Sequence, residues 1–157
     1  MNKYLVILID SLYKKNEILD EIKKVLDSQE LTLAKDPLDI DQINVLMDRK
    51  SELIDKMTQI DDGFTALYAR VSPELKNNTV DYTDKIRDMQ ALIGEISEKT
   101  ALIQAREMRI HSAIEKKLID MKPSQTRAVS KADVASRYYK TMNKTTLPSS
   151  VFINKKN

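Results

Sequence analysis

Apolar and small residues recur at alternating intervals of four and three between residues 80 and 121. This stripe consists of Tyr82, Ile86, Met89, Ile93, Ile96, Thr100, Ile103, Ile110, Ile114 and Met121. The spacing predicts one long helix of the coiled-coil type, with the stripe along one face. Glu107 and Lys117 interrupt the stripe, and their neighbours Met108 and Leu118 continue it, because an untwisted helix drifts about 20° per heptad. One helix cannot bury this stripe alone, so we expect the other helices to be arranged around it.

Two similar stripes precede this one and predict two more long helices. The first predicted helix runs from about residue 2 to residue 33, with Lys15 and Gln29 at polar positions of its stripe. Its apolar members are Leu5, Leu8, Leu12, Leu19, Ile22, Leu26 and Leu33. The second predicted helix has Lys50 at its one polar position. Its apolar members are Ile43, Leu46, Leu53, Met57, Ile60, Phe64, Leu67 and Val71.

Proline marks both predicted connections between the helices. Pro37 predicts a tight reversal, because proline disfavours a helical residue before it and suits the first helical position, where Asp36 would cap the free amides. Pro73 predicts the end of the second helix, and Thr79 or Asp81 is the expected cap of the third. Connections this short place successive helices side by side in opposite directions.

These elements predict an all-α protein, with an elongated antiparallel three-helix bundle over residues 1–121 and a flexible tail over residues 122–157. The composition agrees, because two glycines and four prolines among 157 residues favour long helices over a sheet with many turns. Gly63 lies inside the second predicted helix at a cost of about 1 kcal/mol relative to alanine. Its presence suggests that a neighbour approaches beside Phe64.

Cysteine content and hydropathy bear on the compartment. The chain contains no cysteine, so neither a disulfide framework nor a thiolate zinc site is expected, and a reducing cytoplasm is the natural location. The most apolar run covers residues 5–9 and is too short for the core of a signal peptide or for a membrane span. We therefore predict a cytoplasmic protein without stable membrane insertion.

No group of residues in the sequence indicates catalysis. His111 and Glu107 lie one helical turn apart, but a metal site needs more ligands than this pair, and we interpret His111 as a residue at the edge of the core. We interpret Asp61 and Asp62, and the alternating charges of the bundle, as a solvated surface. No glycine-rich phosphate loop or activated nucleophile is found. The sequence predicts no catalytic residue, no metal and no cofactor, and hence no enzyme.

Residues 122–157 differ in charge from the rest of the chain. They contain eight basic residues and one acidic residue, a net charge of +7, whereas residues 1–121 contain 18 basic and 23 acidic residues, a net charge of −5. The helical pattern breaks near Pro123 and resumes weakly near Ser130, where we expect a short amphipathic helix. A segment this polar buries too little apolar surface to offset an ordering cost of about 1 to 2 kcal/mol per residue, so we expect it to be flexible in isolation.

Apolar side chains within such a tail suggest anchors that become buried when a partner binds. The candidate client-binding and partner-binding residues are Val134, Tyr138, Tyr139, Met142, Val151, Phe152 and Ile153. Tyrosine offers a large contact area at a small cost in entropy, which favours it at interfaces. Two alternatives remain open for the same side chains, namely folding back onto their own bundle and pairing with a second copy.

The three long amphipathic helices with their polar gaps, followed by residues 135–142 (ASRYYKTM) and 151–156 (VFINKK), resemble flagellar export chaperones of the FlgN type. The resemblance implies a cytoplasmic, noncatalytic protein that binds hook-filament junction (hook-associated) proteins, prevents their premature assembly and delivers them to the flagellar export gate. It also implies that residues 130–157 contain the client or gate contacts, with Tyr138 and Tyr139 as the first candidates.

Two other classes of function fit the same sequence. A structural coiled-coil subunit or adaptor would use its stripes for permanent oligomerisation, and a homodimer is one assembly that the stripes allow. A tail with a net charge of +7 would also suit nucleic acid or an anionic membrane surface, with the tyrosines stacking on bases. The basic residues are dispersed along the tail, so we predict that it binds protein and no nucleic acid.

Overall fold

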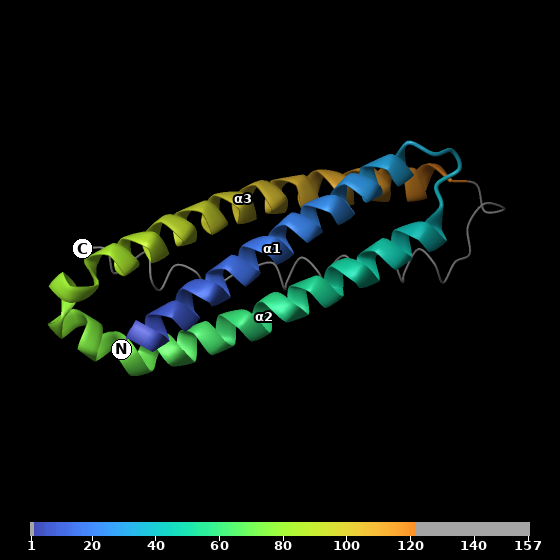
Figure 1. Cartoon of the computed structure of the whole chain (residues 1–157). Coiled ribbons are helices and arrows are strands. Elements are labelled where there is room, and N and C mark those ends of the chain that lie inside the picture. Colours follow the sequence, from blue (N-terminus) through green and yellow to red (C-terminus); the bar gives the residue numbers. More distant parts are fainter. Residues whose placement is uncertain (1, 122–157) are drawn as a thin grey trace.

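The computed structural model describes residues 2–121, and this part of the chain is almost entirely helical. Helix α1 spans Asn2–Leu33, α2 spans Ile40–Asn77, a short 3-10 helix η1 spans Thr79–Tyr82, and α3 spans Thr83–Asp120. Figure 1 shows the three long helices side by side in an elongated rod, each running opposite to the one before it. The predicted all-α three-helix bundle is confirmed for the part of the chain that the structure describes.

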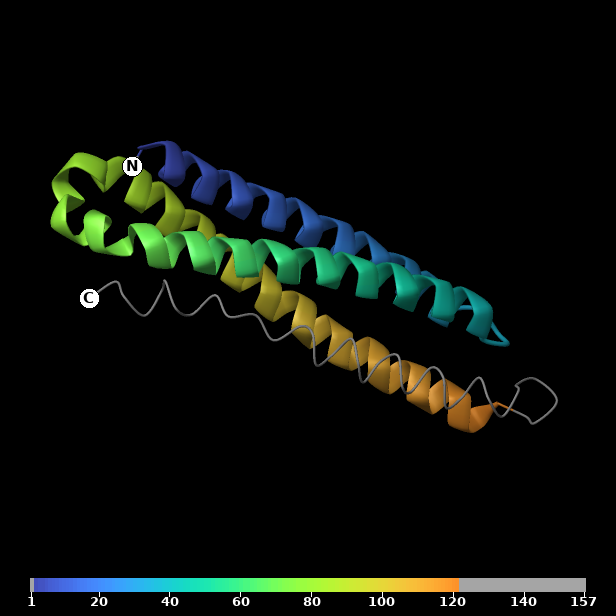
Figure 2. The same cartoon turned by 90° about the horizontal axis from the view of Figure 1, so that it is seen from below.

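Helix α1, and not α3, is the central element of the bundle. It packs along both α2 and α3, whereas α2 and α3 make few close backbone contacts with each other. Figure 1 shows α1 between the other two helices, and Figure 2 shows α3 diverging from α2 toward its C-terminal end. The expectation that the last helix organises the fold was wrong. An apolar stripe shows that a helix has a partner but not how many, and α1 is the helix that contacts both of the others.

The predicted apolar stripes form the core, and most of their members are buried. Full burial of a leucine, isoleucine or methionine side chain contributes roughly 1.5 to 3 kcal/mol each, so the stripes supply the main stabilisation of the rod. Several stripe members toward the η1 end are only half-buried, although Val71 there is buried, and they are Ile60, Phe64, Leu67, Tyr82 and Ile86. None of the helices within residues 2–121 is long and apolar enough to cross a membrane.

Helix α2 begins three residues later than the sequence predicted. Its N-cap is Asp39 rather than Asp36, and the Asp39 Oδ1 atom accepts a hydrogen bond from the backbone N–H of Gln42 at 3.0 Å. Leu38 precedes the cap and Ile43 follows it by four residues, and both are buried. Apolar residues at these two positions fix the entry of a chain into a helix. Burial of Leu38 thus favours Asp39 as the cap.

Helix α2 also continues past the proline that was expected to end it. Pro73 lies inside the helix, which ends only when the Asn78 N–H donates to the Glu74 carbonyl at 3.0 Å. Pro73 itself is exposed, while Val71 and Leu75 on either side of it are buried in the core. The apolar contacts of these two residues offset the hydrogen bond that proline cannot donate.

Neither residue predicted to cap the third helix is its N-cap. Helix α3 begins after Tyr82, with no hydrogen bond from a capping side chain. The 3-10 helix η1 precedes it instead, and the Asp81 N–H donates to the Asn78 carbonyl at 3.1 Å. A short 3-10 helix thus satisfies backbone groups at this turn, where the sequence predicted a side chain to do so.

Candidate functional site

The seven candidate partner-binding residues lie outside the residues that the structure describes. They are Val134, Tyr138, Tyr139, Met142, Val151, Phe152 and Ile153. The expected flexibility of the tail and its short amphipathic helix concern the same residues, so these remain predictions. The features of residues 2–121 to be considered as candidate sites are two buried polar clusters, a set of ion pairs between helices, and a groove between α1 and α2.

The first buried polar cluster joins α1 to α2 near the middle of the rod. The Lys15 Nζ atom donates to Asp61 Oδ1 at 2.6 Å, and the two residues are only 3% and 9% exposed. Burial raises the pKa of Asp61 above its ordinary value, and the charge and hydrogen bond of Lys15 oppose this shift. The interpretation of Asp61 as a solvated surface residue was wrong, because Lys15 occupies a core position directly opposite it.

The second buried polar cluster connects all three helices. Lys50 of α2 is fully buried, and its Nζ atom lies 2.5 Å from Glu107 Oε1 of α3 and donates to Gln29 Oε1 of α1 at 3.0 Å. Gln29 Nε2 in turn contacts the sulfur of Met47 at 3.2 Å. Burial lowers the pKa of Lys50, and the attraction of Glu107 offsets part of that effect. These side chains form a polar layer across the core.

The polar layer corrects the sequence interpretation of α3. The sequence predicted that Glu107 interrupts the stripe and that Met108 continues it, but Glu107 is 1% exposed and Met108 is 58% exposed. Lys50 supplies the reason, since a buried lysine needs a carboxylate and Glu107 provides it. Polar residues stood at stripe positions on all three helices. If these polar residues are interpreted as partners of one another across the core, and not as gaps in the stripes, the sequence predicts the polar layer.

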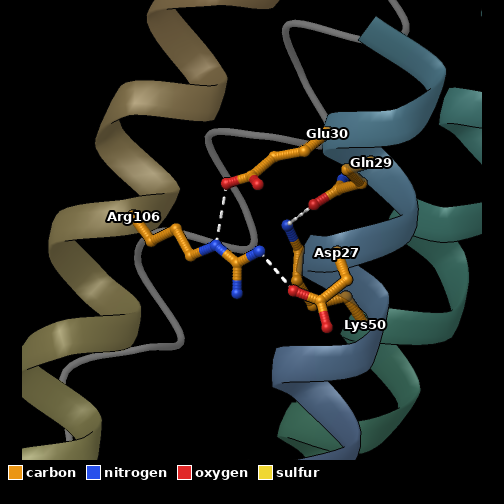
Figure 3. Close-up of polar contacts among 5 residues, drawn as sticks. All are labelled: Asp27, Gln29, Glu30, Lys50 and Arg106. Carbon is orange, nitrogen blue, oxygen red and sulfur yellow. Dashed lines mark hydrogen bonds and ion pairs between the residues drawn. The ribbon is translucent and has the colours of Figure 1, made fainter. Parts of the chain in front are cut away.

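Ion pairs on the surface link α1 to both neighbours. Arg106 of α3 donates from Nε to Glu30 Oε1 at 2.8 Å and from Nη2 to Asp27, as Figure 3 shows together with the Lys50–Gln29 hydrogen bond. The hydrogen bond from Arg106 lowers the pKa of Glu30. Further pairs at 2.9 and 3.2 Å are Lys99–Asp20 and Arg49–Glu21.

The residues of the weak metal candidate take separate partners. Glu107 is paired with Lys50, and His111 Nε2 lies 3.2 Å from Glu115 Oε1 at the edge of the core. Within residues 2–121, no group of three or more histidine and carboxylate side chains is placed to hold a metal ion. The contacts of these residues fit a helical scaffold.

A shallow groove opens between α1 and α2, next to the Lys15–Asp61 pair. Its apolar floor is formed by Ile18 of α1 and Ile60 of α2, both half-buried. Its rim is polar and exposed, and consists of Lys14, Glu17, Lys56 and Gln59. We refer to these six residues as the α1–α2 groove. Nothing in the sequence indicated this groove, because helical periodicity does not determine the distance between two neighbouring helices.

The chain matches a known protein family. Residues 1–118 match the family model described as FlgN protein, which covers most of the bundle and ends before the tail. No curated protein and no solved structure shows a match to the chain.

Proposed function

We propose a specific function from one premise: this chain belongs to the FlgN family of flagellar export chaperones. In our proposal it works in the cytoplasm and is not an enzyme. It binds hook-associated (junction) proteins, prevents their premature assembly and delivers them to the export gate. The family match over residues 1–118 is the single observation that carries the proposal.

The physical basis is that apolar segments of unassembled proteins tend to pair with one another. A chaperone need only cover the apolar face of such a segment to prevent this pairing. We propose that the tail does so, through the aromatic residues Tyr138 and Tyr139, the neighbouring Val134 and Met142, and the apolar cluster at residues 151–153. Ordering a flexible segment costs several kcal/mol, so binding of this kind stays weak enough for release.

The test of this proposal uses the junction protein from the same organism. We expect full-length protein to bind it, and the double variant Tyr138→Ala/Tyr139→Ala to bind at least about tenfold more weakly in calorimetry, as for the loss of interface anchors. The helical circular dichroism should be unchanged, because the buried core residues that the structure describes lie between Leu5 and Leu118. A matched control is Tyr13→Ala, which removes an exposed tyrosine of α1 that does not line the α1–α2 groove.

Two results would count against the proposal. Absence of binding by the wild-type chain would refute the junction protein as its client. Binding by the wild type that is unchanged after deletion of residues 123–157, with helicity preserved, would refute the role of the tail.

A further inference from the structure

The α1–α2 groove continues along both helices as two rows of residues at helical spacing. On α1, Ile18 follows Ile7 by eleven residues and Lys14 by four, and Tyr4 precedes Ile7 by three, so all four share one flank of the helix. Tyr4 and Ile7 are 37% and 44% exposed, large fractions for apolar side chains beside a core. The apolar surface therefore extends from the groove toward the N-terminus of α1.

On α2, the corresponding row contains a glycine. Lys56, Ile60, Gly63 and Leu67 follow one another at intervals of four, three and four, which places them on one flank. The sequence predicted that a neighbour approaches Gly63, but a Cβ atom added there would meet nothing within 4 Å. A helix-interior glycine costs about 1 kcal/mol, and no neighbour among residues 2–121 fills the space beside it. This flank of α2 is therefore accessible to another protein chain.

The charge around the α1–α2 groove indicates what kind of chain would bind there. Lys14 and Lys56 stand on opposite sides of the groove, with Glu17 as its one acidic rim residue. Lys14 pairs with Asp10 of its own helix at 3.1 Å, but both side chains are mostly exposed and such a pair is worth little. A helix with apolar residues on one face and carboxylates beside them would complement this surface. The tail of this chain, with a net charge of +7, lacks that complementarity.

We propose that the α1–α2 groove is a second docking site, which binds one amphipathic helix of the junction protein. The apolar face of that helix lies on Ile18 and Ile60 and passes close to Gly63, and its carboxylates lie near Lys14 and Lys56. This inference rests on the proposed function and adds the bundle to the tail as a binding surface. Two weak sites on one chain bind a client more tightly than either alone and still allow stepwise release.

The first experiment measures the affinity of full-length variants for the junction protein by calorimetry. Gly63→Leu fills the open space and should weaken binding about tenfold, as for the loss of one interface anchor. Gly94→Leu is the matched control, because Gly94 also lies inside a long helix with nothing within 4 Å of an added Cβ. Circular dichroism should show both variants as helical as the wild type.

Charge reversal provides an independent variant. Lys14→Glu/Lys56→Glu should also weaken binding about tenfold, whereas Arg87→Glu/Lys116→Glu, which changes the net charge equally at exposed positions of α3, should leave the affinity unchanged. Wild-type binding with unchanged affinity for both groove variants would overturn the docking site and leave the proposed function standing. Absence of wild-type binding would overturn the proposed function, and the junction protein as occupant of the groove with it.

A crosslinking experiment identifies the occupant directly. The chain has no cysteine, so Gly63→Cys and Gly94→Cys each carry one benzophenone label on the full-length protein. Illumination with the junction protein present should yield an adduct to the junction protein from position 63 and none from position 94. An adduct from position 63 to a second copy, or to the tail of the same chain, would overturn the proposal.

Discussion

The two halves of the rod are stabilised in different ways. The ion-pair half, farthest from η1, contains the ion pairs Asp20–Lys99, Glu21–Arg49, Asp27–Arg106, Glu30–Arg106 and Lys50–Glu107 between different helices, whereas the Lys15–Asp61 pair lies near the middle of the rod. The aromatic half, next to η1, contains every aromatic residue that the structure describes, and these are Tyr4, Tyr13, Phe64, Tyr68 and Tyr82. None of these five aromatic side chains is buried.

The ion-pair half therefore determines how the three helices align, whereas the aromatic half offers exposed side chains for binding. The charged contacts of the ion-pair half allow only one alignment of the three helices, because a shift would leave Lys50 or Glu107 buried without a partner. The aromatic half is held mainly by apolar packing, which tolerates repacking more easily. Phe64 and Tyr68 stack there at 6.3 Å, half-exposed on α2. Half-exposed aromatic side chains commonly anchor protein interfaces, and the α1–α2 groove leads toward this half.

The largest expected effect comes from breaking the polar layer of the ion-pair half. Glu107→Leu leaves Lys50 buried beside Gln29 without its carboxylate, and should reduce the free energy of unfolding by about 3 to 5 kcal/mol in urea titrations. The double variant Lys50→Met/Glu107→Leu should recover most of the loss, because it replaces the pair by apolar groups of similar volume. A single variant as stable as the wild type would show that the layer does not specify the alignment.

The pH dependence of stability provides a second test of the polar layer. Because burial lowers the pKa of Lys50, the unfolded chain binds more protons than the folded chain between that lowered pKa and the ordinary lysine value. The stability of the wild type should therefore rise with alkaline pH relative to Lys50→Met/Glu107→Leu, by at most about 1.4 kcal/mol per pH unit. Urea titrations in steps from neutral pH to about pH 10 measure this difference. If the free energy of unfolding changed equally with pH in the two proteins, burial would not disfavour the charged form of Lys50.

The smallest expected effect comes from the surface of the ion-pair half. Arg106→Ala removes two contacts to α1, but Asp27 and Glu30 are about half-exposed, so we expect a loss of only about 0.5 to 1 kcal/mol. The difference from the wild type should shrink between about 0.1 M and 1 M salt, where the Debye length falls from about 10 Å to 3 Å. A loss of stability as large as that of Glu107→Leu would show that the surface ion pairs, and not the buried polar layer, determine the alignment of the helices.

The sequence was sufficient to predict the number of helices and their apolar faces, because both follow from spacing within one segment. Helix ends were harder, since Asp36 and Asp39 are equally good capping residues and only the burial of Leu38 selects between them. Pro73 was misread for a related reason, as its tolerance depends on an exposed position and buried neighbours.

The buried polar clusters could be predicted only in part. Lys15, Gln29, Lys50 and Glu107 were all recognised at stripe positions, but periodicity does not state what lies opposite. Lys50 finds Gln29 on α1 and Glu107 on α3, so its environment depends on the alignment of three helices. The α1–α2 groove is less predictable still, because its width depends on the distance between two helices.

Hydrogen exchange of the full-length protein, with and without the junction protein, shows directly which surface of the bundle the client covers. We predict added protection along residues 4–18 of α1 and 56–68 of α2, where the groove and its two rows lie, and unchanged exchange along α3. Protection that falls on α3 alone, with these two segments unchanged by a bound client, would contradict this prediction.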